Sequence, residues 1–276
     1  GSATTVSTAD EVMRLTHAGR LLMGHTASEA MYYTGSVQVQ GTNSTTSAIT
    51  IKTNQNDSGG PALVLGKSRG AVGSATAVND DDVLGHIFFN GADGTDTVSY
   101  GAEIRCQVDG TPGSNDMPGR LAFFTTADGA ATSTERLRID CRGFLGINES
   151  NPDELLHISA NNNGVTAITS ANNTLRFTDT DTTATSNQPG GVIEWETLDS
   201  TAAGVNAYIA TKNSNTGYAS MHFGTGNTST LEDRLVLGQG GDLTLYGTEG
   251  TSANLYLIAD QGDDNGDGWR VGSNQD

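Results

Sequence analysis

The segment Glu135-Arg-Leu-Arg-Ile-Asp-Cys-Arg-Gly143 decides the fold, because it recurs without a gap as Asp233-Arg-Leu-Val-Leu-Gly-Gln-Gly-Gly241. A shorter copy, Arg14-Leu-Thr-His-Ala-Gly19, matches Arg138-Ile-Asp-Cys-Arg-Gly143. Self-similarity along a chain is typical of proteins built from repeated structural units. The sequence therefore predicts repeated units, each about the length of one small domain.

The segments between these copies also correspond, and they do so in the same order. The pairs are Gly85-His-Ile-Phe-Phe89 with Gly191-Val-Ile-Glu-Trp195, Glu103-Ile104 with Tyr208-Ile209, and Arg120-Leu-Ala-Phe123 with Ser220-Met-His-Phe223. A preserved order indicates a repeated structure rather than one motif matched by chance.

Most of these segments alternate between apolar and polar residues. Ile104, Cys106 and Val108 alternate with Glu103 and Arg105. This period of two predicts strands with one buried face and one solvated face. We expect Cys106, and likewise Cys141, to be buried free thiols.

The composition agrees with an all-β protein. Glycine accounts for 36 of 276 residues and only 35% of residues are hydrophobic, so turns are frequent. The predicted class is a series of tandem antiparallel β modules, sandwich-like, joined by hairpin collars. A net charge of -18 argues against a nucleic-acid partner, and no apolar run is long enough for insertion into a membrane. We expect an extracellular protein.

The repeats divide the chain into four parts. Residues 1–30 are an N-terminal collar or linker, and residues 31–158 are the first β module with its collar hairpin. Residues 159–247 are a second β module with a shorter collar, and residues 248–276 begin a truncated third module.

Sequence motifs for catalysis are missing. The chain contains no GxSxG elbow, no phosphate-binding loop and no HxxxH pair, so the sequence predicts a protein that is not an enzyme. Asp263, Asn265 and Asp267 fit the front half of a calcium loop, but the twelfth position is Asn274 rather than Glu. A solvated turn is the preferred interpretation, with Ca²⁺ as the alternative and no other cofactor expected.

The segment from Arg136 to Ile158 resembles a motif that recurs in bacteriophage tail fibres, upstream of a C-terminal intramolecular chaperone domain. Gly143, Gly146, Pro152 and His157 match that motif, and further similarity covers most of residues 36–158. The resemblance implies a homotrimeric, elongated fibre in the virion that takes part in host attachment. Asn148 stands where the motif has Gly, and Asn also adopts the left-handed conformation.

Two short strands separated by a turn at Pro152 predict a compact hairpin, too small to be stable alone. Three copies meeting on an axis would bury its apolar side chains, with His157 making a structural hydrogen bond. The predicted trimer-collar residues are Leu145, Ile147, Pro152, Leu155, Leu156, His157 and Ile158.

The sequence thus favours a segment of a viral tail fibre that displays loops to a host cell-surface glycan or protein receptor. Two alternatives stay open. A polysaccharide-degrading tailspike would show a long parallel β-helix with a carboxylate groove. A cellular surface adhesin repeat would share the fold and lack the viral role.

Overall fold

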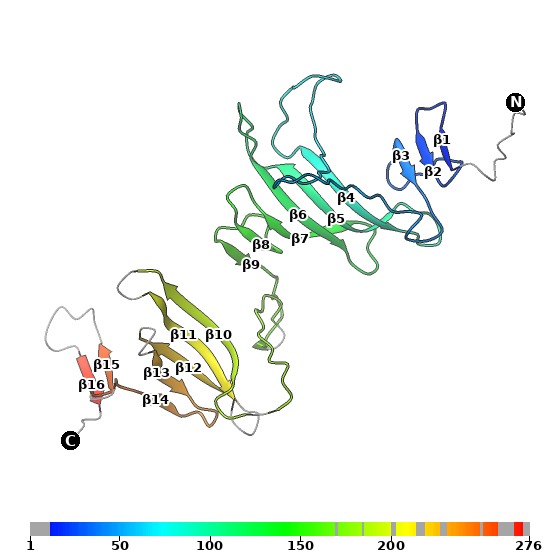
Figure 1. Cartoon of the computed structure of the whole chain (residues 1–276). Helices are drawn as coiled ribbons and strands as arrows, with labels where there is room; N and C mark the ends of the chain where they lie inside the picture. Colours follow the sequence, from blue (N-terminus) through cyan, green and yellow to red (C-terminus); the bar gives the residue numbers. More distant parts are fainter. Residues whose placement is uncertain are drawn as a thin grey trace, which may run out of the picture. The chain divides into compact units, whose positions relative to one another are not determined.

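The fold is known from a computed structural model that describes residues 12–168, 171–183, 185–199, 203–213, 219–226, 231–248, 251–258 and 268–272. Within these residues every regular element is a β-strand, and the strands form four sheets (Figure 1). The all-β prediction is confirmed. The described part of the chain contains no helix long and apolar enough to cross a membrane. The chain divides into two compact units, Gly1–Asn173 and Thr174–Asp276.

The first sheet contains six strands whose spatial order follows the sequence. They are β4 (Val83–Gly91), β5 (Ser99–Val108), β6 (Gly119–Thr126), β7 (Ser133–Ile139), β8 (Leu145–Ile147) and β9 (Leu156–Ile158). Strands β4 to β8 are antiparallel, whereas β9 runs parallel to β8. Each long strand returns through a turn rich in Gly, Asp and Asn, as the alternating pattern and its punctuation predict.

The second sheet repeats this arrangement. Its strands, in order, are β10 (Pro189–Thr197), β11 (Gly204–Asn213), β12 (Ala219–Thr225), β13 (Glu232–Leu237) and β14 (Leu243–Leu245), all antiparallel.

Even the irregularities of the two sheets agree. The β4–β5 register shifts between Phe89 and Asn90, and the β10–β11 register shifts at the equivalent step after Trp195. The β6–β7 shift after Phe123 has its counterpart after Phe223. β-bulges bend a strand at a defined place, so their agreement shows that the repeat extends to the backbone.

The predicted collars recur at the level of single hydrogen bonds. Strands β1 (Met13–Leu15), β2 (Leu21–Met23) and β3 (Val37–Val39) pair antiparallel and then parallel, as β7, β8 and β9 do. The tight turns use left-handed glycines, with φ of 76° at Gly19 and 83° at Gly143. Arg14 Nη1 donates to the Thr26 carbonyl at 3.1 Å, and Arg138 Nη1 donates to the Ser150 carbonyl at 2.5 Å.

The predicted hairpin between Leu145 and Ile158 is wrong in one respect: the two strands are parallel, with Leu145 opposite Leu156 and Ile147 opposite Ile158. The hairpin partner of β8 is β7 instead. The chain leaves β8 through Asn148, which adopts a left-handed φ of 54° as expected. It then crosses over, so that Leu156 enters the sheet in the same direction as Leu145.

The last described strands, β15 (Asn254–Ile258) and β16 (Gly268–Gly272), form an antiparallel pair. The loop between them carries Asp263, Asn265 and Asp267, which lie outside the described residues. Cys141 is exposed in the turn after β7 and Cys106 is half-buried, so the prediction of two buried thiols is wrong.

Candidate functional site

Each sheet carries one continuous apolar face. Residues directly opposite in a ladder point to the same side of a sheet, so the strand register defines these faces. The apolar face of the first sheet comprises Ile87, Ile104, Phe123, Leu137, Ile147 and Ile158, with Cys106, Leu121, Ile139, Leu145, Leu156 and Phe89 beside them. The apolar face of the second sheet comprises Ile193, Ile209, Phe223, Leu235 and Leu245, with Met221, Leu237, Leu243 and Trp195.

These apolar faces are incompletely covered in the single chain. Ile87 is 43% exposed and Phe89 54% in the first sheet, and the equivalent Ile193 and Trp195 are 43% and 50% exposed in the second. Isolated exposed apolar residues are ordinary, but contiguous apolar patches of this kind mark interaction surfaces.

The opposite face of the first sheet reverses the sequence-based expectation. Glu103, which alternation assigns to a solvated face, is only 2% exposed, whereas its neighbour Ile104 on the apolar face is half-buried. Tyr32 and Tyr33 pack their rings against Phe88 on this side, at centroid distances of 4.9 and 6.4 Å. The chain therefore covers its charged face better than its apolar face.

Glu103 is held by Arg105 and His86, which lie on the same face. Arg105 donates from Nε and Nη2 to the two carboxylate oxygens at 2.6 and 2.7 Å, and His86 contacts the carboxylate through Nδ1. The Arg105 guanidinium also lies 4.2 Å above the Phe124 ring. Burial by itself would raise the pKa of Glu103, but the bonds from Arg105 and His86 lower it below its usual range.

The second sheet builds a related network around Asp233. Tyr208 donates its hydroxyl to this carboxylate, and Lys212 Nζ approaches its two oxygens at 2.9 and 3.2 Å. Burial would raise the pKa of Asp233, but the bonds from Tyr208 and Lys212 lower it. Burial, followed by the bond to Asp233, raises the pKa of Tyr208 to about 12.

Ser220, His222 and Asp233 lie in the order of a charge relay. Ser220 Oγ is 2.6 Å from His222 Nε2, and His222 Nδ1 is 2.9 Å from an Asp233 oxygen. However, His222 Nδ1 makes no hydrogen bond of good geometry, and the carboxylate is already bound by Tyr208 and Lys212. We interpret the cluster as a structural network that satisfies a partly buried carboxylate.

The predicted collar residues separate into three groups. Leu145, Ile147, Leu156 and Ile158 share the apolar face. His157 lies opposite Gly146 on the charged face, with Nδ1 2.8 Å from Asp153. Pro152 is fully buried, and Leu155, which is 72% exposed, precedes β9. The sequence found these residues but could not assign their faces, because the register of β9 against β8 decides which side chains share a face.

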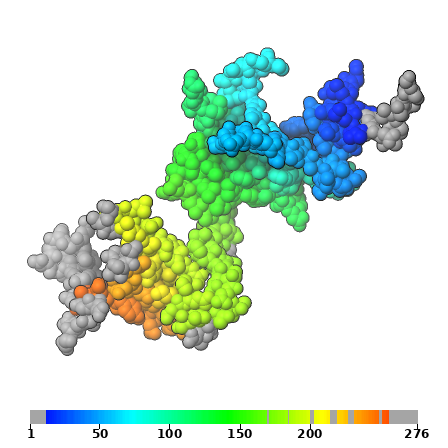
Figure 2. Space-filling view, in the orientation of Figure 1, coloured from blue at the N-terminus to red at the C-terminus, as the bar shows by residue number. Residues whose placement is uncertain are grey.

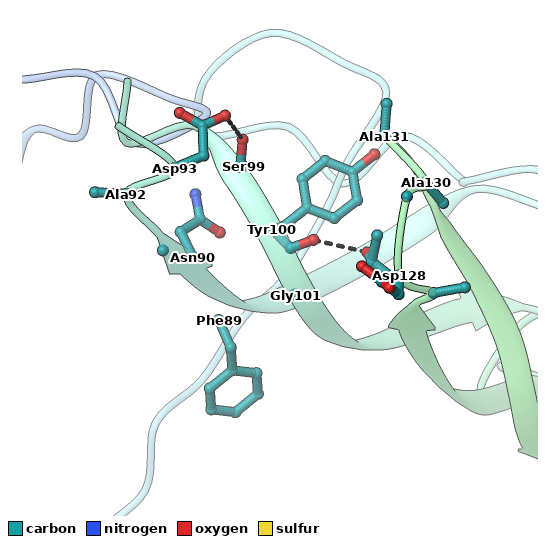
Figure 3. A pocket seen from close by; sticks show the side chains of 14 residues that line it. Phe89, Asn90, Ala92, Asp93, Ser99, Tyr100, Gly101, Asp128, Ala130 and Ala131 are labelled. Carbon is teal, nitrogen blue, oxygen red and sulfur yellow. Dashed lines mark hydrogen bonds between the residues drawn. The ribbon is translucent and has the colours of Figure 1, made fainter. Parts of the chain in front are cut away.

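A polar groove at one end of the first sheet is the main candidate for ligand binding. It has a volume of about 560 Å³ and lies between the loops that join β4 to β5 and β6 to β7. Figure 3 shows the Tyr100 ring within the groove, with Asp93 and Asp128 at its borders and the Phe89 ring directed away. Asp93 is fixed by Ser99 Oγ at 2.9 Å, and Asn90 contributes a buried oxygen without a partner. Sequence analysis missed the groove, because its two loops are distant in the sequence.

Comparisons of the chain with known proteins found matches among solved structures. No protein-family model and no curated protein matches it. Among solved structures, the carboxy-terminal domain of the bacteriophage T5 L-shaped tail fibre aligns with 72% of this chain and 91% of its own length, at 12% identity and a TM-score of 0.34. The same domain with its intramolecular chaperone domain aligns with 72% of this chain, at 13% identity and a TM-score of 0.34. This chain spans 62% of that longer structure.

Proposed function

We propose that the chain is a structural and attachment segment of a phage tail fibre, and that it assembles as a homotrimer through the apolar faces of its two sheets. The observation that carries this proposal is the repeated, incompletely covered apolar face, which each sheet presents at equivalent strand positions. Each unit contributes one large open sheet instead of a closed sandwich, together with one small sheet of two or three strands. We infer that the layer covering each large sheet comes from other copies.

Burial of these faces supplies the driving force. A large apolar side chain gains on the order of 1 kcal/mol when a half-exposed surface is covered, and each sheet presents several such side chains. Copies arranged around an axis would cover all the apolar faces at once. The number three comes from the resemblance of the collar motif to that of trimeric tail fibres.

Open sheet edges support assembly as well. Strands β4 and β10 are nine residues long, and within the described residues neither has a partner on its outer side. Long free edges invite uncontrolled pairing, and association of copies is one way to protect them. A ring of copies places unlike edges next to each other and closes on itself.

The groove beside Tyr100 is the proposed attachment site. An aromatic ring flanked by carboxylates and an amide suits the apolar faces and hydroxyl groups of a surface glycan. Binding of the wild-type protein to an oligosaccharide array, with loss in Tyr100→Ala, tests this role. Equal binding by the variant and the wild type would show that the groove is not the glycan site. Attachment would then use another loop or a protein receptor.

The two alternatives make different demands. A tailspike enzyme built on a parallel β-helix would stack short parallel rungs, whereas the long strands here are antiparallel meanders. A non-enzymatic role therefore stays our proposal. The cellular adhesin shares every feature above, and the genomic neighbourhood of the coding sequence separates it from the fibre.

Multi-angle light scattering across a range of concentrations tests the assembly. The chain has a mass of 28.6 kDa, and the proposal expects a species three times as heavy. A mass that stays at one copy throughout the range would contradict the proposed function.

A further inference from the structure

The apolar face of each sheet contains a hole at the same position. In the first sheet, Leu65 lies beside Gly85 and lines an open cavity of about 210 Å³. In the second sheet, Phe177 lies beside Gly191 and lines an open cavity of about 230 Å³. The two holes are lined by equivalent residues, namely Ile87, Ile104, Cys106 and Leu121 in the first and Ile193, Ile209, Thr211 and Met221 in the second.

The first hole is held open by fixed groups. Lys67 and Arg69 both bind Asp82, at 2.7 and 2.6 Å, which anchors the segment that carries Leu65. A Cβ atom on Gly85 would lie 2.8 Å from the Leu65 side chain, so a larger residue at position 85 would displace Leu65. Figure 2 shows part of the segment before β4, in light blue, lying across the green atoms of the first sheet.

On the outermost long strand of each sheet, the apolar face also carries a large aromatic side chain that is half-exposed, here called the knob. Phe89 is 54% exposed on β4, and Trp195 is 50% exposed at the equivalent position of β10. Each knob lies four residues beyond the glycine at the floor of the hole, and it points to the same side of the sheet.

We propose that Phe89 of one copy fills the first hole of its neighbour, and that Trp195 fills the second hole in the same way. This inference rests on the proposed trimer and specifies how its copies interlock. A knob cannot enter the hole of its own sheet, because four residues along a strand separate them by about 13 Å. The knob of one copy and the hole of the next are different parts of the surface, so their contact is heterologous. Such contacts close into a ring when the copies are related by cyclic symmetry.

The chemistry of both partners fits this contact. Aromatic side chains in apolar pockets contribute most of the binding energy at many interfaces. Aliphatic residues line most of both holes, together with Cys106 and His86 in the first and with Thr211 and Phe177 in the second. His86 contacts the Glu103 carboxylate, so a neutral ring meets no unpaired charge there. The repetition of both knob and hole in two sheets argues that they belong together.

A native thiol makes the proposal testable, since Cys106 lines the first hole. The experiment uses the full chain carrying Cys141→Ser and Phe89→Cys, treated with a dimaleimide linker shorter than the distance from knob to hole within one chain. The expected result is a covalent trimer on a denaturing gel. Ala130→Cys, exposed in the loop after β6, replaces Phe89→Cys in the matched control and should leave the copies unlinked.

The second sheet gives an independent pair in case Phe89→Cys disturbs folding. Trp195→Cys with Thr211→Cys, in a chain where Cys106 and Cys141 are both Ser, should also link the copies. Phe89→Ala should weaken association roughly tenfold or more. A trimer by mass that neither pair cross-links would overturn the interlocking and leave the proposed function standing, whereas a monomer would overturn both.

Discussion

Arg105 binds both carboxylate oxygens of Glu103 across the solvent-poor side of β5, while Ile104 between them points to the other side and is half-buried. A carboxylate that is 2% exposed tolerates burial only when it is paired and hydrogen-bonded. The single chain thus covers its charged face internally and leaves its apolar face incompletely covered.

Acid should destabilise the protein through this carboxylate. The folded-state pKa of Glu103 is lowered, so its contribution to the free energy of unfolding is present above its unfolded pKa of about 4.3 and is lost as pH falls below it. We expect the melting temperature to fall steeply in acid, and less steeply in Glu103→Gln, which is itself less stable at neutral pH by about 1–3 kcal/mol. The melting temperatures of the wild type and the variant are compared across the pH range. A difference that stays the same at every pH would show that Glu103 is not the group involved.

Leu156→Asp should abolish assembly. Leu156 pairs with Leu145 on the apolar face and is 51% exposed in the single chain. Burying a carboxylate there in every copy would cost on the order of several kcal/mol for each site.

The matched control is Leu155→Asp, because Leu155 precedes β9 and is 72% exposed. A second control, Asn163→Asp, changes a solvated loop. Light scattering should give trimers for both controls and smaller species for Leu156→Asp. If Leu156→Asp kept both the mass and the melting temperature of the wild type, the collar would not be part of the interface.

Gly146→Ala should unfold the collar of the first sheet. A Cβ atom there would lie 2.2 Å from the carbonyl oxygen of Glu149, and a backbone group cannot move aside as a side chain does. Overpacking of this kind costs about 1–3 kcal/mol. Gly91→Ala is the control, since its Cβ would meet nothing within 4 Å. Urea denaturation should show a lower midpoint for Gly146→Ala only, and equal midpoints for the two variants would refute the steric argument.

Tyr208 should ionise at a higher pH than an ordinary tyrosine side chain. Burial and the bond to Asp233 raise its pKa to about 12, so the neutral phenol stabilises the fold at ordinary pH. This contribution should disappear as pH rises from the unfolded value of about 10 through 12. Ultraviolet difference titration of the wild type and Tyr208→Phe measures it. The variant should lack the transition near pH 12. Loss of a transition near pH 10 instead would contradict the bond to Asp233.

The equivalence of the two large sheets could be predicted from sequence, because the repeated segments recur in the same order along the chain. The alignment of Asp233-Arg-Leu with Glu135-Arg-Leu makes β13 the equivalent of β7. The bulges after Phe89 and Trp195 confirm that β10 is the equivalent of β4. The left-handed backbone conformation of Gly143 and Asn148 could also be predicted, since few residues other than Gly and Asn adopt it.

The direction of β9 could not be predicted from the sequence. An alternating pattern is the same for parallel and antiparallel strands, and the buried Pro152 marks a change of direction without giving its sense. The burial of Glu103 was missed for a related reason. Alternation separates two faces, but it does not tell which face the chain itself covers and which face a partner covers.

Hydroxyl-radical footprinting of the native assembly measures whether other copies cover the apolar faces. Phe123 and Trp195 are 37% and 50% exposed in the single chain, and Asp93 lies in an exposed loop. Phe123 and Trp195 should be protected in the assembly and become reactive in the dissociated Leu156→Asp variant. The loop around Asp93 should be labelled equally in both. Strong labelling of Phe123 and Trp195 in a native trimer would contradict it.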